Sequence, residues 1–442
     1  MLVPLADWSR GGGGQAGADW EVMTMSARRR RAHDRLAGLP GVRPVRRPVG
    51  GPHRAGEEFD LYYARTGRKS EHPLVIVPGG PGAASVALYR GLRRRAAVEG
   101  LDVIMIEHRG VGMSRHDDSG TDLPPEALTV DAAVDDIAAV LDDAHVKSAV
   151  VYGTSYGTYL AAGLGVRHPG RVHAMILDSP LLSADDIDAV REATRRALWD
   201  GADPETAELA TKVRRLVDDD VLTPVAAQLA AGMYGFAGPD VLRRQLDLLL
   251  TGHDWLWGAV RLGTKLLLQR KTPYHHEPDL VGRIGYRELN YAAEPDGGPL
   301  DPAVAFREIA TGDVDFVAEP YDLIASMPGF DWPTAVISGG RDLVTPRAVA
   351  QRIVSLLPDA VLVDLPTAGH SVIDTRERTA LDVVKAVYAG SLHELPSRSA
   401  QLDTEPGGIG VRLLVRAIGA AAVAESAVPS VVPRVVRYVT TS

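Results

Sequence analysis

The sequence contains no cysteine among its 442 residues. This absence excludes disulfide-stapled scaffolds, zinc–thiolate sites, iron–sulfur clusters and a cysteine nucleophile. Because a chain without disulfides suits a reducing compartment, we predict a cytoplasmic location.

Long apolar runs are also absent. No stretch of about 18 or more uncharged apolar residues occurs, so we predict no membrane span. The first residues lack the apolar region of a secretory signal, since Gly11–Gly14 is a glycine run and Arg28–Arg31 is a charge run.

Positive charge is in the minority, with 48 Lys and Arg against 57 Asp and Glu, a net charge of −9. The excess is uneven, because residues 1–56 carry a net +6 and the remainder −15. An acidic body argues against broad binding of nucleic acid or of anionic membranes. The sequence does not determine the oligomeric state.

The composition is otherwise that of a globular protein, with 45% hydrophobic and 24% charged residues. These values exclude wholesale disorder, collagen and coiled coil. The length suits two or three lobes, or one large domain with an insertion.

From Glu57 onward, short β-rich runs alternate with longer helical patterns. This alternation predicts βαβ units and a mostly parallel sheet with helices on both faces. The predicted strands are 59–64, 74–77, 103–106, 149–152, 174–177, 335–338 and 361–365.

The alternation stops after Pro180 and resumes near residue 331, with helical patterns between. We therefore predict an α/β core over 51–180 and 331–390, interrupted by a helical cap over 181–330. Residues 1–50, rich in Gly, Arg and Pro, are predicted to be a flexible basic leader. Residues 391–442 form a C-terminal extension, with a helix expected over 409–427.

The main chemical motif is Gly153-Thr154-Ser155-Tyr156-Gly157, which reads G-x-S-x-G. It follows a predicted buried strand and precedes a helix start. A strand–turn–helix with serine at its apex is typical of a nucleophile elbow. A phosphate-binding turn is the alternative, but the P-loop spacing and its lysine are missing.

A serine nucleophile needs a base, and the base needs an orienting acid. In the fold that carries a nucleophile elbow, the catalytic residues follow one another along the chain as Ser, then Asp or Glu, then His. Asp342 and His370 follow in that order, each just after a predicted strand. Asp178 is a possible substitute acid, although a helix-capping or turn role suits it better.

Acyl transfer through a serine nucleophile also needs backbone N–H donors for the developing oxyanion. We expect one from the Tyr156 N–H, next to the nucleophile, and the other from Gly79 or Gly80 after an earlier strand. No metal site is predicted, because the adjacent His275, His276 and Glu277 cannot all converge on one ion.

Five segments together resemble α/β-hydrolases of the proline iminopeptidase and tripeptidyl aminopeptidase type. They are PGGPG at 78–82, EHRGVGMS at 107–114, GTSYGTYLA at 153–161, SGGRDLVTP at 338–346 and AGH at 368–370. Two departures stand out, since the group usually has His in place of Pro78 and Asp-Gln in place of Glu107-His108.

The resemblance implies an α/β-hydrolase fold with an inserted cap and an aminopeptidase that releases residues from peptide N-termini. It also implies a cap carboxylate that pairs with the substrate ammonium. Glu288 and Tyr291 match the Glu-x-x-Tyr pattern of similar members, with Glu294 and Asp322 as looser alternatives.

The sequence therefore predicts a serine hydrolase in which Ser155, His370 and Asp342 form the triad. It needs no cofactor and acts on a small peptide or a small-molecule acyl substrate. An esterase, lactonase or thioesterase with the same machinery remains an alternative, as does a non-catalytic hydrolase-like binding protein.

Overall fold

The computed structural model describes residues 25–50, 56–269, 272–310 and 315–429. Within these ranges an eight-stranded sheet has the order β1-β2-β4-β3-β5-β6-β7-β8. β1 pairs antiparallel with β2 and β2 with β4, whereas all other neighbours are parallel. The strands are β1 (Val42–Pro48), β2 (Glu58–Thr66), β3 (Leu74–Val77), β4 (Val103–Ile106), β5 (Ala149–Thr154), β6 (Val172–Asp178), β7 (Thr334–Gly339) and β8 (Ala360–Leu365).

Helices cover both faces of this sheet, which explains why β3, β4 and β5 are buried along their whole length. One face packs against α4 (Val130–Asp143), α5 (Tyr156–Arg167) and α15 (Arg347–Leu356). The other packs against α3 (Arg90–Val98), α17 (Glu377–Tyr388) and α18 (Leu395–Asp403). The predicted α/β fold is confirmed.

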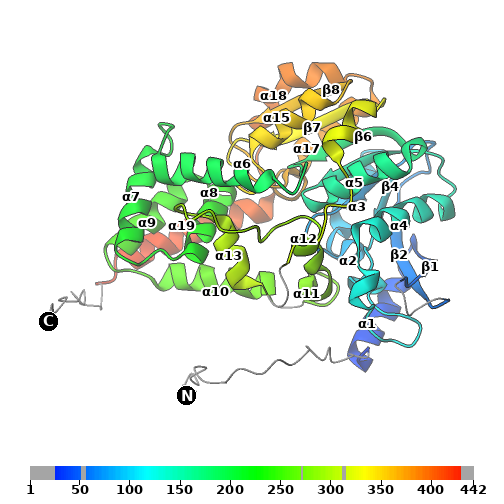
Figure 1. Cartoon of the computed structure of the whole chain (residues 1–442), viewed down its shortest axis with the longest axis horizontal. Helices are drawn as coiled ribbons and strands as arrows, with labels where there is room; N and C mark the ends of the chain where they lie inside the picture. The colour runs from blue at the N-terminus through cyan, green and yellow to red at the C-terminus, as the bar shows by residue number, and fades with distance from the viewer. Residues whose placement is uncertain (1–24, 51–55, 270–271, 311–314, 430–442) are drawn as a thin grey trace.

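The segment between β6 and β7 is helical, and most of it stands beside the sheet domain, at the left of Figure 1. Its residues Val281, Ile284 and Leu323 pack into the core on one face of the sheet. It encloses an apolar core of its own, built mainly from Leu and Ala side chains. Its helices are α6 (Asp186–Arg195), α7 (Ala207–Asp218), α8 (Pro224–Ala237), α9 (Pro239–Leu250), α10 (Trp255–Gln269), α11 (Pro278–Val281), α12 (Arg283–Arg287), α13 (Pro302–Ile309) and α14 (Leu323–Ser326).

The prediction of a flexible leader over 1–50 is wrong for residues 27–48. They form α1 (Ala27–Ala37) and the edge strand β1. Several of the basic side chains that suggested a solvated tail instead pair with acids of the body. Arg46 contacts Asp118, and Arg47 contacts Asp136, each at 2.7 Å. Residues 1–24 lie outside the described residues.

The C-terminal part of the chain packs on both lobes. Helix α18 lies along β8 in the core, whereas α19 (Ile409–Ser426), the helix expected over 409–427, packs on α9 and α10 of the cap. The Glu425 carboxylate is buried and accepts hydrogen bonds from Trp255 N (2.9 Å) and Leu256 N (3.2 Å) at the start of α10. None of the described helices is both long and apolar enough to cross a membrane.

Candidate active site

Ser155 occupies the sharp turn between β5 and α5. Its backbone has φ 51° and ψ −125°, an unfavourable conformation for a residue with a side chain. A Cβ on Gly153 would lie 2.4 Å from Gly157 O, and one on Gly157 would lie 2.1 Å from Val77 O. Both glycines of the motif are therefore required by close backbone packing, as a nucleophile elbow demands.

Three side chains from separate strand ends meet at this turn. His370, on the loop after β8, places Nε2 2.9 Å from Ser155 Oγ and Nδ1 2.8 Å from Asp342 Oδ2. Asp342 lies on the loop after β7. The structure thus brings together the three residues that were expected to form the triad, in one hydroxyl–imidazole–carboxylate chain.

The Asp342 carboxylate is buried and surrounded by donors. It accepts hydrogen bonds from Val344 N at 2.8 Å, Thr345 N at 2.9 Å and Thr345 Oγ1 at 2.8 Å. Burial opposes the charged form, but the imidazole of His370 and these donors outweigh it and lower the pKa of Asp342. The carboxylate therefore stays ionised beside the ring.

The interaction between Asp342 and His370 shifts the pKa of the imidazole in the opposite direction. Burial favours the neutral ring, but the charge and hydrogen bond of Asp342 prevail and raise the pKa of His370 above its ordinary value. A base held in this way can accept the Ser155 proton and stabilise the resulting imidazolium.

Asp178, the possible substitute acid, has another task. It is the fully buried last residue of β6 and accepts hydrogen bonds from Val372 N (3.0 Å) and Ile373 N (2.9 Å). These amides begin α16 (Val372–Thr375), immediately after the histidine loop. Asp178 therefore anchors the segment that carries His370, while Asp342 pairs with the ring.

The loop after β3 borders the nucleophile. A Cβ on Gly79 would lie 3.1 Å from Ser155 Cβ and 3.8 Å from its Oγ, so this loop contacts the serine directly. Gly80 follows with φ 128°, a conformation that favours glycine. Tyr156 is the first residue of α5, on the other side of Ser155.

Of the residues that depart from the family pattern, His108 contacts this loop, whereas Glu107 bonds to residues outside it. Glu107 is fully buried and accepts hydrogen bonds from Val86 N (2.7 Å) and Met113 N (2.9 Å). His108 donates a hydrogen bond to the backbone of Pro78, while its Nε2 has no hydrogen-bond partner among the described residues. Burial lowers the pKa of His108 to about 4, so the ring is neutral near pH 7.

Glu288 follows α12 and is buried. Its Oε2 accepts a hydrogen bond from Val130 N at 2.9 Å, whereas its Oε1 is buried without a hydrogen-bond partner in the described part of the chain. Burial raises the pKa of Glu288. Burial raises the pKa of Tyr156 well above its usual value, and the charge of Glu288 raises it further.

Tyr291 lies among residues of the cap and packs against the apolar core on one face of the sheet. Its ring lies against Gly285, where a Cβ would be 2.6 Å from Tyr291 Cδ2, and 6.1 Å from the ring of Phe306. Its hydroxyl is nevertheless close enough to contribute to the raised pKa of Tyr156.

Two further carboxylates, those of Glu319 and Asp186, were not expected. Glu319 accepts a hydrogen bond from Tyr159 Oη at 3.1 Å, and Asp186 accepts one from Leu182 N at 2.7 Å. Burial raises the pKa of Glu319, and it raises the pKa of Asp186 to about 6. Neither residue belongs to a motif, and only the place of Asp186 at the start of α6 could have drawn attention to it.

A small cavity of about 110 Å³ lies beside the triad, between α8 and the loop that carries Asp342. His370 and Asp342 form one side of it. The residues opposite are small or apolar: Ala231, Gly232, Gly235 and Phe236. Within the described ranges, no group of three or more His, Asp or Glu side chains is arranged to hold a metal ion.

Comparison with known proteins agrees with this architecture. A family model of the alpha/beta hydrolase fold matches residues 72–377. A "Probable proline iminopeptidase" of Leptolyngbya boryana is 24% identical over 334 residues, which cover 73% of this chain and 88% of that protein. A proline iminopeptidase of Lactobacillus crispatus is 32% identical over 128 residues, 28% of this chain and 42% of its own length.

Solved structures of similar fold cover most of this chain. The proline iminopeptidase of Mycobacterium smegmatis covers 79% of this chain and 99% of its own, with 20% identity and a TM-score of 0.49. Est816, described as an N-acyl homoserine lactone degrading enzyme, covers 74% and 96%, with 19% identity and a TM-score of 0.43. The match over 72–377 includes Ser155, Asp342 and His370, and the chain belongs to the α/β-hydrolase fold family.

Proposed function

We propose that this protein is a serine hydrolase that forms an acyl-enzyme on Ser155. The observation that carries this proposal is the chain of two short contacts, 2.9 Å from Ser155 Oγ to His370 Nε2 and 2.8 Å from His370 Nδ1 to Asp342 Oδ2. Its geometry is that of a nucleophile, a general base and an orienting acid.

In the proposed mechanism, His370 removes the proton of Ser155 as the hydroxyl attacks the substrate carbonyl. The backbone N–H groups of Tyr156 and of Gly79 or Gly80 then bind the oxyanion. His370 passes its proton to the leaving group, and water cleaves the acyl-enzyme by the reverse steps. These residues carry out the reaction without a cofactor.

We further propose that the substrate is a short peptide with a free N-terminus. The support is Glu288, whose buried Oε1 has no partner in the described residues and whose charge raises the pKa of Tyr156, the neighbour of the nucleophile. An ammonium group would satisfy this oxygen through a charge-assisted hydrogen bond. The proline iminopeptidase relatives point to the same substrate class.

A substrate panel tests both levels of this proposal. Prolyl and alanyl p-nitroanilides, their N-acetylated counterparts and short-chain p-nitrophenyl esters are assayed with the wild type and with Ser155→Ala. A serine hydrolase loses all of these activities in the variant. An aminopeptidase prefers the free-amine anilides, whereas turnover of esters alone would contradict the peptidase assignment and favour an esterase.

A further inference from the structure

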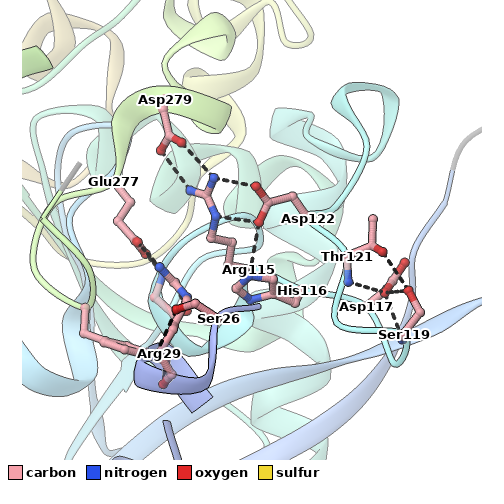
Figure 2. Close-up of polar contacts among 12 residues, drawn as sticks. Ser26, Arg29, Arg115, His116, Asp117, Ser119, Thr121, Asp122, Glu277 and Asp279 are labelled. Carbon is pink, nitrogen blue, oxygen red and sulfur yellow. Dashed lines mark hydrogen bonds and ion pairs between the residues drawn. The ribbon is translucent and has the colours of Figure 1, made fainter. Parts of the chain in front are cut away.

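A buried ion pair joins the N-terminal helix to the cap. Arg29 of α1, with 9% of its side chain exposed, forms a bidentate pair with Glu277, whose side chain is fully buried (Figure 2). Arg29 Nη2 lies 2.9 Å from Glu277 Oε2 and also donates to Gly112 O at 2.7 Å. Gly112 N donates back to Glu277 Oε2 at 2.6 Å.

Glu277 depends on this partner. A buried carboxylate is costly unless it is paired and hydrogen-bonded, and removal of one partner leaves an uncompensated charge. A second buried carboxylate, Glu107, is close enough that Glu277 contributes to the raised pKa of Glu107. Without the guanidinium of Arg29, the two glutamates would repel each other inside the protein.

The backbone of Glu277 holds the loop that borders the nucleophile. Glu277 N donates a hydrogen bond to Gly82 O at 2.8 Å, and Ala84 N donates to His275 O at 2.9 Å. A Cβ on Gly82 would lie 2.9 Å from Pro278 Cα, so the two segments are in close contact. Three residues earlier, Gly79 touches Ser155.

Further contacts hold residues 274–279, the segment that contains Glu277, at both of its ends. Tyr274 Oη donates to Arg29 O at 2.8 Å, and the guanidinium of Arg29 lies 4.7 Å from the Tyr274 ring centre. Arg115, almost fully buried, bridges Asp122 and Asp279, with contacts of 2.7 Å to each (Figure 2). The segment that contacts Gly82 is therefore held between α1 and the loop after β4.

We propose that Arg29 is a positioning residue for the oxyanion loop, residues 78–82, and acts on it through Glu277 and Gly82. The proposal rests on the serine hydrolase function proposed above. It assigns a catalytic consequence to α1, which lies before the region matched by the hydrolase family model.

The test compares Arg29→Met with Arg65→Met. Arg65 forms an equally buried pair with Asp102 at 2.6 Å, but this pair lies before β4, at the end of the sheet away from Ser155. Arg29→Met is expected to lower kcat and the rate of fluorophosphonate labelling together by about 10–100-fold, with KM nearly unchanged, because oxyanion donors act in the transition state. Arg65→Met is expected to lower the melting temperature but to keep both rates within about twofold of the wild type.

A double variant separates positioning from mere stability. In Arg29→Met/Glu277→Gln no unpaired buried charge remains, so the melting temperature is expected to recover while kcat and labelling stay low. Recovery of both rates with the melting temperature would overturn the proposal. So would an Arg29→Met variant with rates as high as those of Arg65→Met.

Hydrogen exchange of a peptide spanning residues 79–86 reports on the loop independently of activity. Exchange there is expected to be faster in Arg29→Met than in Arg65→Met or the wild type. Equal exchange in all three proteins would overturn the link between α1 and the loop. A wild type that fluorophosphonate does not label would contradict the hydrolase function, and the exchange result would still decide the structural link.

Discussion

The α/β core and the wall of the cap bury their charged groups in different ways. In the core, Asp342 and His370 form a complete chain, and each acceptor of Asp342 is occupied by a named donor. In the cap wall, Glu288 keeps one buried oxygen without a partner in the described residues.

This difference separates two tasks. A fully paired buried charge holds one geometry, because any movement leaves a charge uncompensated. An incompletely paired one is a cost to the free protein that a ligand can remove. We therefore propose that the core carries out bond cleavage and that the cap recognises the substrate.

The largest expected effect tests the core alone. Ser155→Ala removes the nucleophile and is expected to lower kcat/KM by about 10⁴-fold or more on every substrate, anilide or ester. The melting temperature should change little, because the Ser155 hydroxyl contacts only the His370 ring among the described side chains. Residual activity within about tenfold of the wild type would show that another group is the nucleophile.

Asp342→Asn tests the orienting acid and its electrostatic effect. Loss of the carboxylate is expected to lower kcat by about 10⁴-fold, because the ring loses its orientation and the imidazolium its stabilisation. Wild-type activity should fall in acid with a midpoint above pH 6.5, since the base must be neutral and its pKa is raised.

The pH profile supplies the control for this variant. With Asp342 replaced, the pKa of His370 loses its main raising influence, so the acid limb should move to lower pH. An acid limb that stays in place would mean that another group controls it. Circular dichroism and thermal melting check that the variant remains folded.

Glu288→Gln tests the cap. A charge-assisted hydrogen bond contributes about 1.5–3 kcal/mol, so kcat/KM on free-amine anilides should fall by about 10–150-fold. N-acetylated anilides, p-nitrophenyl esters and fluorophosphonate labelling should be nearly unaffected. Glu319→Gln is the matched control, because the Glu319 carboxylate already accepts a hydrogen bond from Tyr159. This control should keep the wild-type activity on free-amine anilides. An equal loss of kcat/KM on N-acetylated and free-amine anilides would contradict the division of bond cleavage and substrate recognition between core and cap.

The smallest effect concerns the stability of the cap. Glu425→Ala removes the side chain that accepts from the first amides of α10 and should lower stability by about 1–3 kcal/mol. Because Glu425 bonds to the start of α10 and to no triad residue in the described part of the chain, labelling of Ser155 should keep its wild-type rate. Thermal melting and labelling kinetics measure the two quantities separately.

Much of the fold followed from local patterns. Buried apolar runs ending in glycine, alternating with amphipathic helices, predict β3 and β4 with the observed bounds. The nucleophile elbow was also predictable, because close backbone packing within a few residues of Ser155 requires glycine at positions 153 and 157.

Other elements could not be predicted from local pattern. β1 contains Pro44, Pro48 and three arginines, and it becomes a strand only because β2 offers an edge and acids such as Asp118 pair with its cations. The free oxygen of Glu288 and the neighbouring Glu319 are likewise results of packing, because burial and pairing belong to the assembled protein.

The sequence by itself determined the glycine-flanked turn of Ser155, the order of Ser155, Asp342 and His370 along the chain, and the parallel sheet that places them at one edge. Those features depend on residue type and short-range backbone geometry. Only the tertiary structure decided which charges are compensated. It joined Arg29 to Glu277, 248 positions apart, and left one oxygen of Glu288 without a hydrogen-bond partner in the described residues. The reason is that a charge inside a protein is paired only with the groups that folding brings beside it.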